Sequence, residues 1–195
     1  MKRLLLILIL TFSFQTLSKA DDISDFEIEG MSIGDSLLDF FSKSEIKKNS
    51  FDYYNDKTFT PVQTSKLAFY KLYDRVDFDF KTNDKKYIIH ALYGTISYEK
   101  NINDCYKKMN EIVISMKKLF DNVVVDEKYD EKRPGITGDP TGKSKVTVVS
   151  FWFDNEDRAS VSCYDYSKEH SGKDNLTVGI QTKEQNEFLF NKAYK

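Results

Sequence analysis

The amphipathic segment Asn103–Phe120 constrains the fold more than any other stretch of this sequence. Its apolar residues recur at intervals of three and four, at Cys105, Met109, Ile112, Met116 and Leu119. This spacing places them on one side of an α-helix, and Asn103 is a suitable N-cap residue. Such a stripe needs a second apolar surface to pack against, and strand-like sequences on both sides of the segment supply one.

Strand-like sequences precede and follow this predicted helix. Apolar and charged residues alternate in Arg75–Lys81, whereas Lys86–Tyr98 is apolar in both phases, as in a central strand. The other predicted strands are Leu67–Tyr73, Asn122–Glu127, Lys145–Phe153, Arg158–Tyr166 and Asn175–Gln181. Short turns between consecutive strands favour antiparallel pairing. The pattern predicts an α+β fold, with an antiparallel sheet of about six strands packed against one long amphipathic helix and with short N- and C-terminal helices.

Capping residues mark the two short helices. Asp35 or Ser36 precedes an apolar turn at Leu37–Phe41, and Thr182, with Gln185 three residues later, forms a capping box. The last helix is expected to continue to about residue 193. Two stretches, 49–64 and 130–144, are predicted to be irregular loops because they are polar and contain the three prolines.

The first twenty residues have the three parts of a secretory signal peptide. Lys2 and Arg3 precede the apolar run Leu4–Phe14, and small residues precede a cut after Ala20. A membrane-spanning helix needs about 20 apolar residues, so this run is too short to be an anchor. We expect residues 1–20 to be removed and residues 21–195 to form a single α+β domain that is periplasmic or secreted, with no membrane span.

The charge balance argues against a nucleic-acid partner. The chain has 29 Lys and Arg against 31 Asp and Glu, a net charge of −2, and three of the basic residues lie in the predicted signal peptide. Proteins that bind nucleic acids carry a basic footprint, which is missing here. The many Tyr, Phe and Lys residues are typical of an AT-rich genome and are not evidence of function.

The two cysteines are predicted to form a disulfide bond. Cys105 lies on the apolar stripe of the helix, and Cys163 shares a strand face with Val161. If Val161 points inward, Cys163 does so too, which would allow a helix-to-strand bond. Exported proteins meet oxidising conditions, in which paired cysteines tend to be bonded. The alternative is two buried free thiols, because the sequence does not give the distance between the Cα atoms.

The sequence GDPTGKS at Gly138–Ser144 has some features of a phosphate-binding loop but not its spacing. Such a loop needs four residues between its first glycine and the Gly-Lys pair, whereas three residues separate Gly138 from Gly142. A valine-rich strand follows, in place of the helix whose N-terminus would bind phosphate. We therefore predict a surface turn and no nucleotide cofactor.

No catalytic or metal-binding set of residues is evident. His90 and His170, the two histidines, lie far apart in the sequence and fit no ligand spacing and no Cys–His signature. Asp77 and Asp79 share a strand face and could act as paired carboxylates, but acids on a half-exposed strand are usually just its solvent face. We expect no catalytic residue, no metal and no cofactor.

Trp152, Tyr164 and Tyr166 are the candidate binding face. If Phe151 and Phe153 point into the core, alternation along the strand turns Trp152 outward. An exposed tryptophan beside two tyrosines would mark a surface that stacks sugars or contacts peptides. The alternative is that these aromatic residues fill the core and form cross-strand pairs.

The run Ile28–Leu38, IEGMSIGDSLL, resembles the start of a family of exported bacterial proteins with no known activity. These proteins share a signal peptide, a GMSIGDS-like motif and two cysteines in DCY and SCYDY settings, and the resemblance covers most of the mature chain. Gly30-Met31-Ser32 before a short helix is also similar to the opening of small envelope-assembly lipoproteins of the BamE/SmpA type. This chain departs from those lipoproteins because it lacks their lipid-bearing cysteine and is longer.

These observations predict an exported, soluble, non-catalytic protein that binds a protein partner or a small ligand in the periplasm or envelope. The alternative is an extracytoplasmic hydrolase that uses carboxylates. A deep pocket with convergent acids would favour the hydrolase, whereas a flat aromatic or edge-strand face would favour a binding protein.

Overall fold

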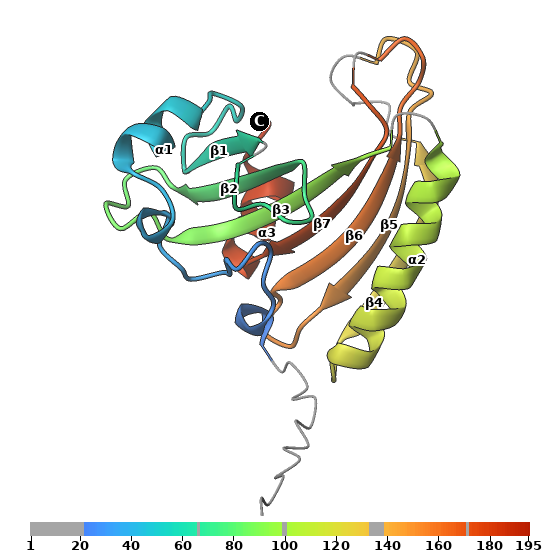
Figure 1. Cartoon of the computed structure of the whole chain (residues 1–195), viewed down its shortest axis with the longest axis horizontal. Helices are drawn as coiled ribbons and strands as arrows, with labels where there is room; N and C mark the ends of the chain where they lie inside the picture. The colour runs from blue at the N-terminus through green and yellow to red at the C-terminus, as the bar shows by residue number, and fades with distance from the viewer. Residues whose placement is uncertain (1–21, 66, 99–100, 133–138, 171) are drawn as a thin grey trace, which may run out of the picture.

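The computed structural model describes residues 22–65, 67–98, 101–132, 139–170 and 172–195 (Figure 1). The predicted signal peptide, residues 1–20, lies outside these ranges. Seven strands form one antiparallel sheet in the order β1-β2-β3-β7-β6-β5-β4. Their bounds are β1 Phe59–Ser65, β2 Arg75–Lys81, β3 Ile89–Ser97, β4 Val124–Lys132, β5 Lys145–Trp152, β6 Arg158–Asp165 and β7 Asn175–Gln181.

Three α-helices accompany the sheet: α1 Lys43–Asn49, α2 Ile102–Leu119 and α3 Lys183–Asn191. Two short 3₁₀ helices, η1 Ile23–Asp25 and η2 Leu37–Asp39, precede α1. Side chains cap each α-helix at its N-terminus: Ser42 for α1, Asn101 for α2 and Thr182 for α3. In the described part of the chain, no helix is both long enough and apolar enough to span a membrane.

The predicted architecture of about six strands packed against one long helix is wrong. The sheet has seven strands, the structure is mostly β, and the longest helix, α2, has 18 residues. α2 contacts β6 and β7, so it covers only one part of the sheet. The chain does combine helices with an antiparallel sheet, but the sheet dominates.

The strand that the prediction missed is β1, in the stretch expected to be a loop. Pro61 has no N–H to donate, which normally excludes proline from a central strand. β1 tolerates it because β1 is an edge strand. Ser50 forms a bridge with Val62, and the Phe51 N–H donates to the Pro61 carbonyl at 3.2 Å, so the chain covers this edge itself.

The expected strand at Leu67–Tyr73 is absent, because these residues form turns. The Glu29 carboxylate accepts hydrogen bonds from the backbone N–H groups of Lys71, Leu72 and Tyr73, at 2.7 to 2.9 Å. These groups would otherwise pair with a neighbouring strand. A distant carboxylate therefore determines the conformation of this segment.

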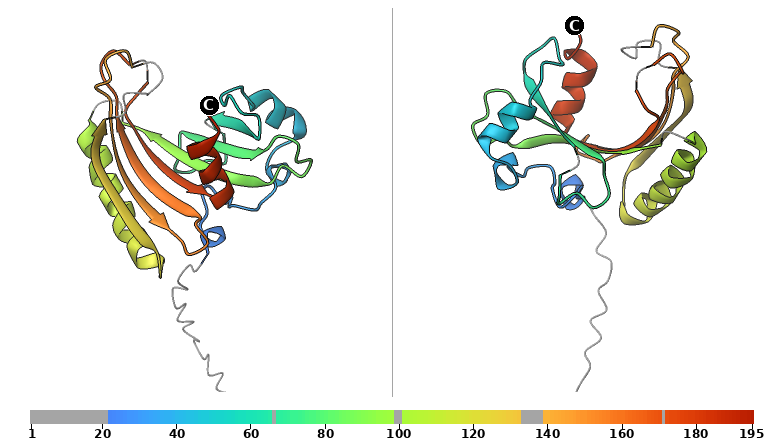
Figure 2. Two further views of the ribbon diagram at one scale, coloured as in Figure 1. Left: turned by 180° about the vertical axis from the view of Figure 1, so that it is seen from behind. Right: turned by 45° about the horizontal axis from the view of Figure 1, so that its top comes forward.

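The sheet is strongly curved, and its convex face carries the main core (Figure 2). α2 and the N-terminal segment, residues 22–49, cover this face. The strands contribute buried apolar side chains that include Phe78, Leu92, Val161, Val178 and Ile180. Met109, Met116 and Phe120 pack on them from the α2 side, and Ile28, Met31, Leu37 and Ile46 from the N-terminal segment.

The concave face is divided in two (Figure 2). α3 packs over the part formed by β1–β3, where Tyr54, Phe59, Phe188 and Ala193 make a second, smaller apolar cluster. Among the described residues no helix covers the remainder, which is formed by β4–β7. This exposed half of the concave face lies opposite α2.

The predicted disulfide bond between Cys105 and Cys163 is confirmed. Their Cα atoms are 6.1 Å apart, and both residues are fully buried in the main core. The bond joins the first turn of α2 to β6 across 58 residues of sequence. It therefore fixes the helix to the convex face at the end where the helix begins.

We expect the Cys105→Ala/Cys163→Ala variant to be less stable than the native protein by about 2–4 kcal/mol, because the unfolded chain regains the entropy of an open loop. Urea denaturation of both proteins, followed by circular dichroism, measures the difference. The native protein should also show no titratable thiol when denatured without reductant. A stability difference below about 0.5 kcal/mol would contradict this prediction.

Candidate functional site

The exposed half of the concave face is lined by rows of mostly polar side chains. Residues paired across an antiparallel sheet point to the same face. The strand register gives one row of Asp77, Tyr93, Gly179, Ser160, Ser150 and Asp126. The adjacent row contains Arg75, Thr95, Thr177, Ser162, Val148 and Lys128. A concave surface of this composition differs sharply from the apolar convex face of the same strands.

Small hydroxyl side chains form the centre of this surface. Ser160 and Ser162 are each 7% exposed, and both lie in the rows that face the concave side. The Thr177 hydroxyl donates to the Asn175 side chain at 3.0 Å and lies 3.4 Å from the Thr95 hydroxyl. We call Ser160, Ser162, Thr177 and Thr95 the hydroxyl floor. Each of its hydroxyls can both donate and accept a hydrogen bond.

Two arginines flank the hydroxyl floor, and both have partners. Arg75 Nε lies 2.9 Å from the Asp77 carboxylate. Arg158 donates to the Ser150 hydroxyl at 2.9 and 3.1 Å and to the Gln181 side chain at 3.3 Å. Its guanidinium also lies over the Trp152 ring, 5.4 Å from the centroid. The positive charges on this face are therefore held in place by neighbouring side chains.

Tyrosines surround the hydroxyl floor. The Tyr93 ring lies against Gly179, where an added Cβ would be 2.6 Å from the Tyr93 Cδ1 atom. Tyr164 stacks on Tyr166 with a centroid distance of 5.9 Å, and Tyr166 stacks on His170 at 4.1 Å. Burial raises the pKa of Tyr93 well above its usual range, so this hydroxyl stays protonated.

The structure places all three residues of the predicted binding face beside this surface, but not in one cluster. Phe151 and Phe153 are buried in the main core, so Trp152 points to the concave side. Trp152 pairs with Arg158 at one end of β6, whereas Tyr164 and Tyr166 are at the other end. Six residues of strand, or about 20 Å, separate the two ends.

The hydroxyl floor and Tyr93 lie between these ends, and sequence reasoning did not single them out. The alternation of Ser160 and Ser162 with Val161 and Cys163 was a usable signal. It showed that one face of β6 is polar. The position of Tyr93 on that face depends on the pairing of β3 with β7, which the sequence does not specify.

The expectation that Asp77 and Asp79 form a solvent face is wrong for Asp79, which is 2% exposed beneath α3. The Tyr54 hydroxyl donates to its carboxylate at 2.8 Å, and the Gln185 side-chain amide donates to the same oxygen. Burial raises the pKa of Asp79 to about 7, and the nearby charge of Asp77 contributes to the increase. Burial also raises the pKa of Asp77, although Arg75 opposes this effect.

The two histidines lie in separate places. His90 is half-buried beside α3, with Nδ1 3.5 Å from the Thr182 hydroxyl and 4.0 Å from the Glu184 carboxylate. His170 accepts a hydrogen bond from the Gly172 N–H at Nδ1. In the described ranges, no three His, Cys, Asp or Glu side chains are grouped so that they could hold a metal ion.

The phosphate-loop-like stretch is described from Asp139 to Ser144, and Gly138 lies outside the described residues. The Asp139 carboxylate accepts hydrogen bonds from the backbone N–H groups of Thr141 and Ser144 at 2.9 and 2.8 Å. It also accepts one from the Ser167 hydroxyl at 2.9 Å. Two backbone N–H groups of this turn are thus bound to a carboxylate of the protein itself.

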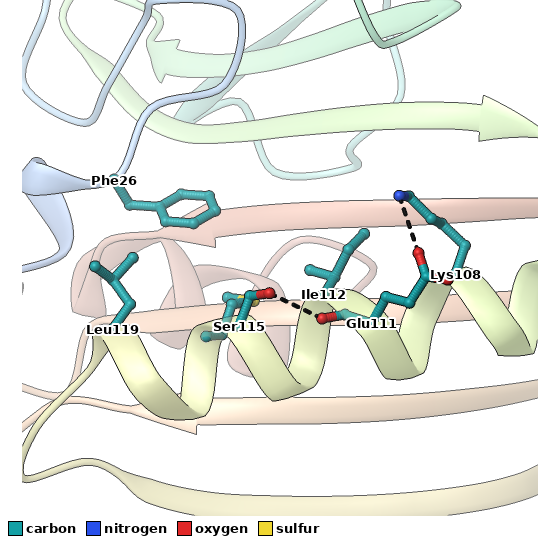
Figure 3. A pocket seen from close by; sticks show the side chains of 7 residues that line it. Phe26, Lys108, Glu111, Ile112, Ser115 and Leu119 are labelled. Atoms are coloured by element: carbon teal, nitrogen blue, oxygen red, sulfur yellow. Dashed lines mark hydrogen bonds and ion pairs between the residues drawn. The ribbon is translucent and has the colours of Figure 1, made fainter.

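A hollow of about 320 Å³ lies on the convex side, between Phe26 and α2 (Figure 3). Ile112, Met116 and Leu119 supply most of its apolar lining. Its one acid, Glu111, is paired with Lys108 at 3.2 Å. A hollow of this kind does not bring carboxylates together.

A smaller hollow, of about 140 Å³, lies beside β1 and the aromatic residues Phe51, Tyr53 and Tyr54. Its acid, Asp52, forms an ion pair with Lys57. This hollow, like the larger one, therefore lacks the convergent acids that a carboxylate-based hydrolase would require.

The chain matches no protein-family model, and no curated protein or solved structure is significantly similar to it. Its function must therefore be inferred from its own residues and surfaces.

We expect the contribution of Asp79 to the stability of the native protein to fall as the pH rises from about 4 to about 7. Asp79 has a higher pKa when folded than when unfolded, so the folded state binds more protons in this range. An increase from 3.8 to about 7 corresponds to about 4 kcal/mol, lost as the pH rises through the folded pKa. Urea denaturation of the native protein and Asp79→Asn between pH 4 and 9 measures the effect.

Asp79→Asn should lack this part of the pH dependence and keep the contribution of other carboxylates. Parallel stability–pH curves for the two proteins would show that Asp79 does not titrate in this range.

We expect Gly179→Ala to destabilise the protein by about 1–3 kcal/mol, because the added methyl displaces the Tyr93 ring. In a Tyr93→Ala background the same change should cost much less, since the ring is gone. Thermal denaturation of the two single variants and the double variant gives this coupling. Additive effects would show that the ring does not occupy this position.

Proposed function

We propose that this protein is an exported, non-catalytic binding protein whose ligand lies on the exposed half of the concave face. The observation that carries the proposal is the hydroxyl floor, with the largely buried Ser160 and Ser162 at the centre of a curved sheet. Both hydroxyls can donate and accept hydrogen bonds, and a ligand bound on this surface would offer them partners.

The aromatic and polar residues around the floor favour a neutral, polyhydroxylated ligand such as an oligosaccharide. Sugar hydroxyls donate and accept hydrogen bonds, as serine and threonine hydroxyls do. Tyr93, Tyr164 and Trp152 offer flat apolar surfaces for sugar rings. Arg75 and Arg158 are held by Asp77, Ser150, Gln181 and the Trp152 ring. The Asp77 carboxylate balances the charge of Arg75, which favours a neutral ligand at that end of the floor.

Export fits two features of the chain. The first twenty residues have the pattern of a signal peptide, and the buried Cys105–Cys163 disulfide suits an oxidising compartment. Oligosaccharides are abundant outside the cytoplasm, so the proposed ligand and location agree.

The hydrolase alternative is less well supported. Asp79 has a raised pKa, as a general acid requires. Its carboxylate, however, is covered by α3 and bonded to Tyr54 and Gln185. Asp77, its nearest carboxylate along the strand, is paired with Arg75. A substrate on the hydroxyl floor would not contact the Asp79 carboxylate.

Trp152, the single tryptophan of the chain, provides the test. We expect its fluorescence to change when the mature protein is titrated with neutral tetrasaccharides of glucose or N-acetylglucosamine. Ser160→Ala/Ser162→Ala should weaken binding by about 10-fold or more, because each lost hydrogen bond costs about 0.5–1.5 kcal/mol. Isothermal titration calorimetry gives the dissociation constants.

Ser115→Ala is the matched control, since Ser115 is exposed on α2, on the other side of the sheet. It should bind as the native protein does. Tighter binding of a sulfated tetrasaccharide than of any neutral one would contradict the neutral class. Equal affinity of Ser160→Ala/Ser162→Ala and the native protein would show that the floor is not the site.

A further inference from the structure

The two edges of the sheet differ. The segment around Ser50 and Phe51 covers β1. β4, at the other edge, pairs with β5 on its inner side, and among the described residues no segment pairs with its outer side. An uncovered edge strand offers unpaired N–H and C=O groups to another strand.

Apolar side chains are also exposed on β4. Val124 is 69% exposed, Val125 37% and Tyr129 65%. Single exposed apolar residues are normal on a protein surface, but on an uncovered edge strand they can contact a strand that is added there. The charged residues between them, Asp126, Glu127 and Lys128, normally discourage unwanted edge pairing. Their order determines which partner the strand can accept.

We propose that β4 pairs with β4 of a second copy of this chain, antiparallel and about a two-fold axis, so that the sheet continues from one copy into the other. With the axis perpendicular to the sheet, paired residues lie on the same face and one residue pairs with itself. The possible registers near the middle of the described side chains are centred on Asp126, Glu127 or Lys128.

Of these three registers, the one centred on Glu127 brings complementary side chains of the two copies together. It places Asp126 opposite Lys128 of the second copy and Val125 near Tyr129 of the second copy, which lies at the irregularity that follows Lys128 in β4. Opposite charges and apolar–aromatic pairs both stabilise cross-strand contacts. Centring on Asp126 or on Lys128 would also place two like charges opposite each other at the axis, and neither register would pair Asp126 with Lys128.

In this register Glu127 lies opposite Glu127 of the second copy, and the negative charge of each is already balanced within its own chain. The Glu127 carboxylate lies 2.7 Å from the Lys117 Nζ atom of α2 and accepts a hydrogen bond from the Tyr129 hydroxyl. The two carboxylates at the axis would each bring a lysine. The like-charge contact at the centre is therefore balanced by α2.

This pairing has a geometric consequence for the concave face. Asp126 and Lys128 lie in the same rows as the hydroxyl floor, whereas Glu127 faces α2. Two copies joined at β4 would therefore place their exposed concave halves on the same side of one continuous sheet.

The experiment is analytical ultracentrifugation of the mature protein from about 1 to 100 µM. We expect a reversible dimer. Asp126→Lys and Lys128→Asp should each weaken it at least 10-fold, because each puts like charges opposite each other. Asp126→Lys/Lys128→Asp should restore it, since the pair is only exchanged. Lys108→Asp is the control: it makes the same change of charge as Lys128→Asp, but on α2, and should leave the dimer intact.

The register has its own test. Glu127→Cys should form an intermolecular disulfide under mild oxidation, because residue 127 meets its own copy at the axis, whereas Asp126→Cys should not. A native protein that stays monomeric at 100 µM would overturn the proposal. So would a dimer that neither single charge variant weakens, or one that the double variant does not restore.

Discussion

Burial of the convex face of the sheet is the interaction on which the rest of the structure depends. Every strand from β1 to β7 except β4 contributes to one apolar cluster that α2 and the N-terminal segment cover. Each fully buried Phe, Leu, Ile or Val side chain contributes about 1.5–3 kcal/mol. The disulfide then fixes α2 to this face. Because the main core lies on one side, most of the other side of the same strands is free to be polar.

The concave face shows what this freedom permits. Near α3 it carries a buried carboxylate, Asp79, which has no cationic partner among the described residues and costs stability once it is ionised. Away from α3 it carries hydroxyls, and a glycine that leaves room for the Tyr93 ring. A protein whose stability depended on both faces would fill these positions with apolar side chains. Unfavourable polar groups kept in this way are typical of functional surfaces.

Local sequence patterns correctly predicted those helices and strands whose conformation depends mainly on the residues within them. The alternation in Arg75–Lys81 and the apolar stripe of the helix locate β2 and α2 to within one or two residues. Pro61 led to the prediction of a loop in place of β1. A proline is tolerated only in an edge strand, and which strand lies at the edge depends on the order of all the strands in the sheet. Glu29 bonds to residues more than forty positions away. The alternation of side chains along a strand predicted that Cys163 points into the core and that Trp152 points to the opposite face. The contact of the Tyr93 ring with Gly179, and the position of Ser160 beside them, depend on how β3, β7 and β6 pair.

The order of the strands has a consequence for how the chain folds. β7 is the last strand along the chain, yet it lies at the centre of the sheet, between β3 and β6. Until it is inserted, β1–β3 and β4–β6 are two separate meanders that share no hydrogen bond. Pairing between such distant segments is slow. The sheet can therefore be completed only after β7, the last strand to be synthesised, has joined the two meanders.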